Sequence, residues 1–427
     1  MLDCSSFAVA ARPRLHLSTA RGWINDPHGV TWYEGRYHVF FQHVPDTPTW
    51  ATHCHWGHMS GSDLVNWNDD TAIALKPDDG EAGCWSGTLV LDDDRPTILY
   101  TSVGSVDRND SRIVMALGDN EMRNWEKLPT PVLEAPPGVT EFRDPSVHRD
   151  GAGWRMVVGC RYQGAATALM FRSLDLRQWS EPTILCQRKS DPADPLFTGD
   201  GWECVQFIEI DGVWVLIACA WTNKPDDRMV YAVGDFDGAV FEPRSWHRLD
   251  HGGTLYATTT FRDADGRWCA LSWIRELEPP RSGRVRAGAL SLPHRLSVVD
   301  DRLVIAPHPD VDRLLGPDLP LDEPLPPQFD LQLTLVAPVR IGCLELEHDG
   351  ENILLAVGSA PVRRIPAPAG SVVRVVVDED IAEVFAGGEV AVVRVPDQTD
   401  RIVGLGANMR LRTLDCRETT EVAEFGK

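Results

Sequence analysis

A repeat of 54 to 60 residues runs through the first 300 positions of this 427-residue chain and limits what the chain can fold into. The first element of the repeat is a turn followed by a short apolar run, as in EGRYHVFFQ, DRPTILYTS, GAGWRMVVG, DGVWVLIAC and DGRWCALSW. Aligning the reference residues of these runs gives successive steps of 60, 57, 60 and 54 residues for Tyr37, Thr97, Trp154, Trp214 and Trp268. Short apolar runs between turn residues are typical of β-strands.

A second element follows each of the first four copies after about 25 to 32 residues. The sequences SDLVNW, NEMRNW, LDLRQW and FEPRSW end at Trp67, Trp125, Trp179 and Trp246. In each, a tryptophan lies between polar residues, which is the pattern expected of an exposed outer strand. Five copies of a four-stranded unit predict a five-bladed β-propeller with a central channel. The alternative is a large β-sandwich with an accidental periodicity.

The composition changes after residue 306. Seven prolines lie between Pro307 and Pro327, which predicts a semi-rigid linker. Beyond it, alternating apolar and polar residues separated by turn residues predict a β-sandwich. We therefore expect an all-β fold with three regions: a propeller in residues 1–306, a linker in residues 307–329 and a sandwich in residues 330–427.

Composition and charge exclude several classes of partner. The net charge is −22, and both nucleic acid and anionic membranes require basic surfaces. No apolar run approaches the roughly 20 residues of a membrane span, and the N-terminus lacks a basic segment of the kind found in signal peptides. We expect a cytoplasmic protein whose ten cysteines, which form no CxxC pair, are reduced.

Acidic residues recur at one place in the repeat. Counting back 10 or 11 residues from the reference residues gives Asp26, Ser86, Asp144, Glu203 and Ala257. In a propeller these points lie on the innermost strands and meet at one mouth of the channel. Asn-Asp-Pro in WINDPHG would by itself indicate a turn. The shared phase instead predicts that Asp26, Asp144 and Glu203 meet in a functional site.

Three carboxyl groups at one mouth favour acid–base chemistry on a sugar. Repulsion between like charges and partial burial should raise the pKa of one of them. A general acid would then lie beside a nucleophile, as glycoside cleavage requires. Neighbouring aromatic rings suit the apolar face of a sugar, and amide and guanidinium groups suit its hydroxyls. We expect Arg143 to keep the adjacent Asp144 ionised.

The motifs WINDPHG, FRDPSV and WECVQF, in this order, resemble those of glycoside hydrolase family 32, which contains invertases, levanases, inulinases and fructosyltransferases. YHVFFQ, HWGHMSGSDLVNW, WSGT, GALSLPHRLSV and AEVFAGGEV extend the resemblance to roughly residues 14–427. The resemblance implies a five-bladed propeller followed by a β-sandwich. It also implies a retaining mechanism on β-fructofuranosides, with no metal or cofactor.

The resemblance further implies a role for each acid. Asp26 matches the nucleophile, which attacks C2 of the fructosyl unit, and Glu203 matches the acid/base. Asp144 matches the group that stabilises the transition state. Retention would require the carboxyls of Asp26 and Glu203 to lie about 5 to 5.5 Å apart. The residues that match the fructose subsite are Asn25, Gln42, Trp50, Trp85, Ser86, Arg143 and Trp273.

Two departures from the family pattern concern the substrate and the rim of the site. Many invertases carry an acid before the Tyr-Ala pair that holds the glucose of sucrose, whereas this chain reads GGTLYA, with Thr254 near that place. A leaving group other than glucose is therefore favoured. His28 and the pair Val205 and Gln206 replace the usual residues beside the acids, and we expect these changes to alter the rim.

The sequence thus predicts a β-fructofuranosidase acting on sucrose-like or short fructo-oligosaccharides. Its partner would be a small carbohydrate, and the sandwich would pack on the propeller or form a homodimer. The alternatives are a fructosyltransferase on the same site, a non-catalytic sugar-binding propeller, or an inverting hydrolase with carboxyls about 6.5 to 9.5 Å apart. The histidines of THCHWGHM would contribute to packing rather than hold a metal. Cys204 would either tune Glu203 or fill space.

Overall fold

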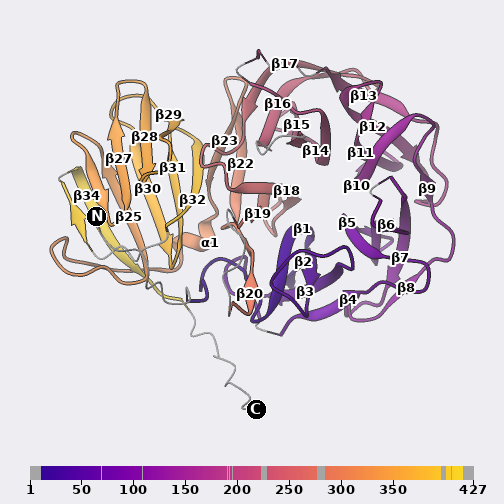
Figure 1. Cartoon of the computed structure of the whole chain (residues 1–427), viewed down its shortest axis with the longest axis horizontal. Helices are drawn as coiled ribbons and strands as arrows, with labels where there is room; N and C mark the ends of the chain where they lie inside the picture. Colours follow the sequence, from indigo (N-terminus) through magenta and orange to yellow (C-terminus); the bar gives the residue numbers. More distant parts are fainter. Residues whose placement is uncertain are drawn as a thin grey trace.

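The computed structural model describes residues 11–416 except 69, 108, 190, 192, 195, 223–227, 277–283, 396–400 and 405. These residues form a ring of five sheets with two further sheets beside it (Figure 1). The helix of the described part, α1 (Pro309–Asp312), has four residues. Among the described residues, no helix has the length and apolar content that a membrane span requires. The expected all-β fold, a five-bladed propeller followed by a β-sandwich, is confirmed.

Each propeller blade is a four-stranded antiparallel sheet. Blade 1 contains β1 (Gly22–Tyr33), β2 (Arg36–Val44), β3 (His55–Gly61) and β4 (Ala72–Leu75). Blade 2 contains β5 (Gly83–Asp92), β6 (Arg95–Val103), β7 (Ser111–Gly118) and β8 (Trp125–Lys127). Blade 3 contains β10 (Val139–Asp150), β11 (Gly153–Tyr162), β12 (Ala165–Ser173) and β13 (Thr183–Arg188). Blade 4 contains β14 (Gly201–Ile210), β15 (Val213–Trp221), β16 (Arg228–Phe236) and β17 (Phe241–Arg248).

Blade 5 brings the chain back to blade 1. It contains β18 (Leu255–Arg262), β19 (Trp268–Ile274), β22 (His294–Val299) and β23 (Arg302–Pro307). Three short strands are added at the edges: β9 (Leu133–Glu134) on β7, β20 (Arg286–Ala287) on β1, and β21 (Ala289–Leu290) on β19. All five reference residues of the sequence repeat lie in the second strand of their blade, which explains the regular spacing.

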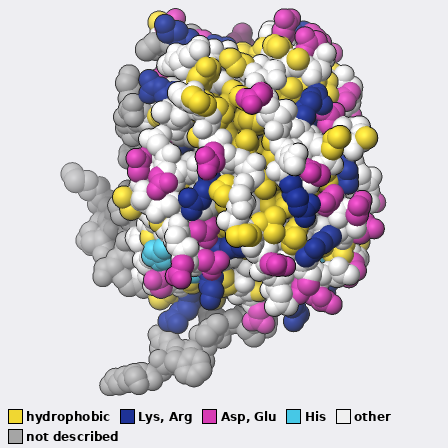
Figure 2. All heavy atoms as spheres, turned by 90° about the vertical axis from the view of Figure 1, so that its right-hand side faces the viewer, with side chains coloured by type: hydrophobic (Ala, Val, Ile, Leu, Met, Phe, Trp, Pro, Cys, Tyr) yellow, Lys and Arg dark blue, Asp and Glu magenta, His cyan; other side chains and the backbone are white. Residues whose placement is uncertain are grey.

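The innermost strands close a ring. Contacts run from β1 to β5, β10, β14 and β18, and β18 contacts β1 again. The hydrophobic core therefore lies between neighbouring blades, as where Val157 of blade 3 packs with Trp202 and Leu216 of blade 4. On the rim farthest from the sandwich, acidic, basic and apolar side chains are interspersed, and the basic ones do not gather into one area (Figure 2).

The repeated tryptophans occupy two kinds of place. Trp125 and Trp246 lie in the outermost strands β8 and β17, as expected. Trp67 and Trp179 lie in the connections before β4 and β13, so the prediction was wrong for these two blades. The Trp179 indole N–H donates to the carbonyl of Leu176 at 3.0 Å, so this ring closes a turn instead of extending a strand.

The sandwich consists of a six-stranded and a five-stranded sheet. In sheet order, the first contains β24 (Leu315–Asp318), β34 (Ala407–Leu414), β25 (Gln328–Thr334), β30 (Val372–Asp378), β31 (Ile381–Ala386) and β32 (Glu389–Arg394). The second contains β29 (Arg363–Pro366), β28 (Asn352–Val357), β27 (Leu344–His348), β26 (Val339–Ile341) and β33 (Ile402–Val403). Alternate residues of β25, Phe329, Leu331 and Leu333, are buried between the sheets, as period-2 alternation predicts.

Part of the expected linker is structured. α1 and β24 both lie within residues 307–329, and β24 pairs with β34 of the sandwich. The three boundaries expected from the sequence stay a prediction.

Blade 5 and the segment that connects it to blade 4 pack on the outer face of the six-stranded sheet. Val392 of β32 belongs to the same hydrophobic cluster as Leu255 and Leu303 of blade 5. The backbones also approach closely, since a Cβ on Gly252 would lie 1.8 Å from the carbonyl oxygen of Val392. Glycine is therefore required at position 252 for the two regions to meet as they do.

A buried group of four ionisable side chains, the His16 cluster, joins the N-terminal segment, blade 5 and the sandwich. It consists of His16, His294, Asp378 and Glu383. Nδ1 of His16 lies 2.9 Å from Asp378 and Nε2 lies 3.2 Å from Glu383, while Nε2 of His294 lies 2.8 Å from Glu383. Burial alone would lower the pKa of His16, but the hydrogen bonds and charges of the two carboxylates outweigh it and raise the pKa to about 9.

Stability is expected to fall between pH 6.5 and about 9. Because the pKa of His16 is raised on folding, its stabilising contribution is complete below pH 6.5 and is lost as pH rises through the folded pKa. The loss corresponds to about 3 kcal/mol. Urea unfolding at several pH values measures it, with His16→Gln as the control that should lack this slope. An equal slope in the variant would contradict the assignment.

Candidate active site

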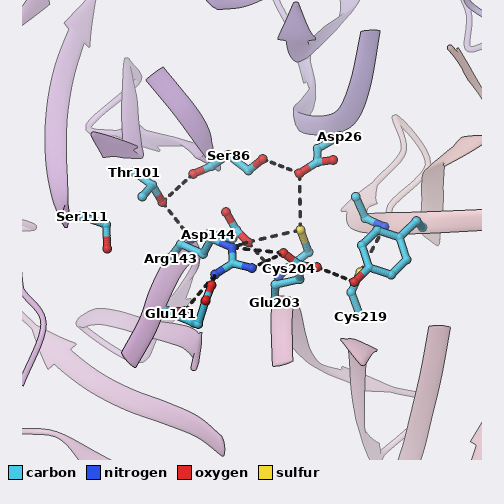
Figure 3. Close-up of polar contacts among 12 residues, drawn as sticks. Asp26, Ser86, Thr101, Ser111, Glu141, Arg143, Asp144, Glu203, Cys204 and Cys219 are labelled. Atoms are coloured by element: carbon cyan, nitrogen blue, oxygen red, sulfur yellow. Dashed lines mark hydrogen bonds and ion pairs between the residues drawn. The ribbon is translucent and has the colours of Figure 1, made fainter. Parts of the chain in front are cut away.

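The structure brings Asp26, Asp144 and Glu203 together at one level of the ring, from β1, β10 and β14 (Figure 3). The Cys204 thiol lies 3.6 Å from Oδ2 of Asp26 and 3.5 Å from Oδ2 of Asp144. The Arg143 guanidinium contacts Glu203 and Asp144, with Nη2 at 2.6 Å from Glu203 and Nε at 3.7 Å from Asp144. One thiol and one guanidinium therefore link carboxylates from three blades.

A β-bulge in every innermost strand directs these side chains. At each bulge, two residues of the inner strand lie opposite one residue of the next strand. The bulges lie between Ile24 and Pro27, Cys84 and Gly87, Arg143 and Ser146, Glu203 and Gln206, and Tyr256 and Thr259. A bulge interrupts the alternation of side chains, so consecutive residues can face the channel.

The three acids occupy three consecutive positions of this feature and not the same one. The last position before the bulge holds Glu203, its first residue is Asp144, and its second is Asp26. The expectation that the acids share one position in the repeat was therefore wrong: relative to Asp26, Asp144 is displaced by one position and Glu203 by two. A second bulge in β1, between His28 and Thr31, and a longer hairpin after β18 change the count along the chain.

The residues directly before the bulge contact one another across three blades. Arg143, Glu203 and Tyr256 occupy it in blades 3, 4 and 5. Nε and Nη2 of Arg143 donate to Oε2 of Glu203 at 3.1 and 2.6 Å, and the Tyr256 hydroxyl donates to Oε1. Nη1 of Arg143 also pairs with Glu141. Both oxygens of Glu203 are thus held in place by donors.

Sequence reasoning missed Tyr256 and Glu141. The repeat count placed Ala257, not Tyr256, at the position of the acids. Had the count been anchored on Arg143 and Glu203, Tyr256 would have appeared as their counterpart in blade 5. Glu141 carries no such signal, because its contact with Arg143 depends on the local path of β10.

Asp26 is held by amide and hydroxyl donors. Nδ2 of Asn25 donates to Oδ1 of Asp26 at 2.7 Å, and the Ser86 hydroxyl donates to Oδ2 at 2.5 Å. Nε2 of Gln42 donates in turn to Ser86 at 2.5 Å, and Asn25 donates to Gln42 at 3.1 Å. The sequence-expected residues Asn25, Gln42 and Ser86 therefore form one network around this carboxylate.

Asp144 has an unusual backbone conformation. Its φ is +63°, and φ is also positive at Cys204 and Ala257, the equivalent bulge residues of blades 4 and 5. The N–H of Asp144 donates to the Thr101 hydroxyl at 2.8 Å, and the N–H of Cys204 donates to Oδ2 of Asp144 at 3.3 Å. Left-handed conformations at non-glycine residues are strained and concentrate at functional sites.

Burial dominates the ionisation of two of the acids. It raises the pKa of Asp144 to about 7, although the charge of Arg143 acts in the opposite direction. It also raises the pKa of Asp26, against the hydrogen bond from Ser86. The charge of Arg143 lowers the pKa of Asp144, as expected, but burial and the neighbouring carboxylates raise it more strongly, so the expectation that Arg143 keeps Asp144 ionised stays a prediction.

Asp144→Asn is expected to stabilise the protein above neutral pH while removing activity. A carboxyl whose pKa is raised on folding loses stability as pH rises, by up to about 4 kcal/mol from this group above pH 7. The amide keeps the shape without the charge. Thermal unfolding of variant and wild type should therefore diverge as pH rises from 4 to 8. A difference in melting temperature that does not change with pH would contradict this.

Aromatic rings lie beside the acids. Trp273 packs edge-on against Trp23 and Tyr256, with centroids 5.6 and 6.4 Å apart. Trp50 packs edge-on against Trp85 at 5.8 Å, and the Trp85 indole N–H donates to the carbonyl of Thr52 at 3.0 Å. Trp50 is 43% exposed, so its ring is available to a ligand.

The substitutions expected at the rim lie in the core instead. His28 is buried and stacks on Trp56, with centroids 3.9 Å apart, and Val205 is fully buried. Oε1 of Gln206 accepts hydrogen bonds from the N–H and hydroxyl of Thr260, at 3.1 and 3.0 Å. These residues join blades and do not shape the mouth.

The histidines of THCHWGHM contact different partners. His53 lies 3.2 Å from Asp46, while His58 stacks on Phe40. Within the described residues, the group whose potential ligand atoms lie within 4.8 Å of one another is Asp263, Cys269 and His308, elsewhere in blade 5. The packing interpretation is therefore favoured over a metal cluster at residues 53–58.

Comparisons with known proteins agree with this arrangement. Residues 16–307 match the profile of the glycosyl hydrolases family 32 N-terminal domain. A sucrose-6-phosphate hydrolase of Zymomonas mobilis is 31% identical over 318 residues, covering 69% of this chain and 61% of that protein. A raffinose invertase of Escherichia coli is 30% identical over 322 residues, covering 71% of this chain and 66% of that protein. The chain thus spans about three fifths of the length of the first of these relatives.

Solved structures share the fold over nearly the whole chain. A β-fructofuranosidase of Bombyx mori superposes with a TM-score of 0.81 at 24% identity, covering 95% of this chain and 94% of that one. A fructan 1-exohydrolase of Cichorium intybus gives 0.78 at 20% identity, covering 95% and 97%. Since the matched profile spans all five blades and the three acids, the chain belongs to glycosyl hydrolase family 32.

Proposed function

We propose that this protein is a retaining glycoside hydrolase that releases terminal β-D-fructofuranosyl units from sucrose-like or short fructo-oligosaccharides. The observation that carries the proposal is the contact cluster of Asp26, Asp144 and Glu203 from three separate blades. The names of the relatives, which include a sucrose-6-phosphate hydrolase, an invertase and fructan exohydrolases, support the substrate class.

In the proposed mechanism, each acid has the role that its surroundings support. Asp26, oriented by Asn25 and Ser86, attacks C2 and forms a covalent fructosyl-enzyme intermediate. Glu203 protonates the leaving oxygen and then removes a proton from the attacking water. Asp144 accepts hydrogen bonds from the fructose hydroxyls and opposes the positive charge that develops on the ring.

The surroundings of Thr254 support a leaving group other than the glucose of sucrose. Thr254 is fully buried, and its hydroxyl donates to the carbonyl of Val392 at 2.6 Å. The nearby Asp250 is also buried, and its carboxylate accepts the N–H groups of Gly252, Thr254 and Leu255. Neither side chain is available to hold a sugar at the mouth. A fructosyl or other leaving group is therefore favoured over glucose.

A product assay tests the proposal across sucrose, sucrose 6-phosphate, kestose, levanbiose, inulin and levan. We expect free fructose from at least one short substrate, with sucrose a poorer substrate than the best of these. NMR during early turnover should show β-fructofuranose as the first product, because two displacements retain the configuration. Asp26→Ala is the control. Inverted product would contradict the retaining mechanism, and longer fructans at high substrate would indicate a transferase.

A cytoplasmic location is part of the proposal. Seven cysteines within the described residues are buried free thiols. Thiols persist in reducing compartments, which supports an intracellular site of action. Dimer formation through the sandwich stays a prediction that light scattering can test.

A further inference from the structure

The propeller channel contains a second cavity beyond the catalytic acids. Its volume is about 860 Å³. It is lined by β1, β5, β10, β14 and β18, at residues that follow the bulges in the direction of the hairpins. None of the three catalytic acids lines it. The five innermost strands therefore present one set of side chains to the catalytic mouth and another to this cavity.

Arg155, in the cavity wall, is a buried cation without a hydrogen bond. Its side chain is 7% exposed, and its guanidinium forms no hydrogen bond with any residue of the described part of the chain. Its ion pair with Asp150 spans 3.9 Å, which is too long for a hydrogen bond. Buried charged groups normally have hydrogen-bond partners, so these donors lack an acceptor that a ligand could supply.

Aromatic rings of the next blade hold this guanidinium. It lies 4.7 Å from the ring centroid of Trp214, 5.3 Å from Phe207 and 5.8 Å from Phe236. Cation–π contacts stabilise the charge through its flat faces. They leave the in-plane N–H groups able to bind a planar or tetrahedral anion in bidentate fashion.

Two further arginines and a neutral histidine lie in or beside the wall. Arg262 lies over Trp268 at 4.3 Å, and Arg149 lies over Trp154 at 3.8 Å. His148 is stacked edge-on against Trp268 at 6.1 Å. Burial, with the charges of Arg155 and Arg262, lowers the pKa of His148 to about 4, so the ring is neutral at neutral pH; its Nε2 lies 3.1 Å from the Ser146 hydroxyl, and Nδ1 is the nitrogen left for a ligand hydroxyl.

Three of the four acids that line the cavity are already engaged. Asp150 pairs with Arg172, Asp263 pairs with Arg267 and His308, and Asp211 accepts the N–H of Val298 at 3.0 Å. The fourth lining acid is Glu209. Trp32, also in the lining, is 37% exposed and offers an uncovered aromatic surface. The lining therefore combines N–H donors that can bind an anion, acceptors for hydroxyl groups and an aromatic surface for a sugar ring.

We propose that this cavity is a second, non-catalytic ligand site for a small phosphorylated sugar. The phosphate binds Arg155 and Arg262, the sugar hydroxyls bind Glu209 and His148, and the sugar ring packs on Trp32. The inference goes beyond the proposed hydrolysis and does not depend on it, because the two sites share no lining acid.

Calorimetric titration of the full-length protein with glucose 6-phosphate tests the site, since this probe has no fructosyl unit for the catalytic subsite. We expect saturable binding of one equivalent, and a dissociation constant at least tenfold larger in Arg155→Met. Arg188→Met is the matched control, because Arg188 also lies over a tryptophan, Trp246 at 5.2 Å, but outside the cavity. Its affinity should equal that of the wild type, and fructoside hydrolysis should be the same in all three proteins.

Three results would overturn the proposal: no saturable binding of glucose 6-phosphate, an unchanged dissociation constant in Arg155→Met, or equal binding of inorganic phosphate, which would exclude a contribution from the sugar. Should Arg155→Met fail to fold, Arg262→Met replaces it. Arg262 is an exposed residue, so the variant should fold and show the same loss of binding. Undiminished binding in that variant would equally contradict the site.

Discussion

Replacement of Asp26 by alanine is expected to lower kcat for fructoside hydrolysis roughly 10⁴- to 10⁶-fold, with the fold retained. The carboxylate is the proposed nucleophile, and the Asn25 and Ser86 donors around it cannot replace it. Folding should survive, because burial raises the pKa of Asp26 and removing the group relieves that cost. Single-turnover kinetics measure the loss, and thermal unfolding checks the fold.

Glu203→Ala provides the matched comparison. It should lose a similar factor on natural fructosides but regain much of the rate with fructosyl fluoride, because a good leaving group needs no general acid. The same donor should not rescue Asp26→Ala, which lacks the attacking group. Rescue of both variants, or of Asp26→Ala alone, would show that the two roles are assigned incorrectly.

Glu383→Ala is expected to lower the free energy of unfolding by about 3 to 5 kcal/mol, the cost of breaking a buried ion pair. Glu383 accepts the N–H of Leu292 at 2.9 Å and contacts both His16 and His294. Its removal leaves buried nitrogen donors of the propeller side without an acceptor. Urea unfolding measures the change.

Glu347→Ala is the control for this experiment. Glu347 lies on β27 of the same sandwich, but its side chain is exposed, so its loss should change stability by less than about 0.5 kcal/mol. Equal effects of the two substitutions would mean that the His16 cluster does not join the propeller to the sandwich energetically.

The repeat made the architecture predictable from the sequence. Turn residues and apolar runs are local signals, and each of the five reference residues from Tyr37 to Trp268 lies in the second strand of its blade. The outer strands were less predictable. Trp125 and Trp179 both close turns onto a carbonyl three residues earlier, yet only Trp125 lies within a strand. The tryptophan motif therefore does not predict where the outer strand begins to pair.

The site was predictable as a meeting of strands but not in its detailed contacts. The positions of Asp26, Asp144 and Glu203 in the repeat placed them at one mouth. The contacts between side chains of neighbouring blades depend on where each residue lies relative to the bulge. The sequence does not show this, so the contact of Tyr256 with Glu203 was missed. The raised pKa of Asp144 could not be read from the sequence either, because the sequence shows its neighbour Arg143 but not the depth of burial.

Because of the bulges, the side chains at the mouth of the channel can differ from one blade to the next. Each blade has a bulge at the same place in its innermost strand, so the residues at the bulge can differ in chemistry from blade to blade while the strand pairing stays the same. Ala257 is the first bulge residue of blade 5, the position that Asp144 and Cys204 occupy in blades 3 and 4, and its side chain is only a methyl group. Asparagine and aspartate tolerate its backbone conformation, with φ at +50°. The methyl group of Ala257 is 2% exposed and lies in the hydrophobic core, so a polar side chain at this position would also need space and hydrogen-bond partners.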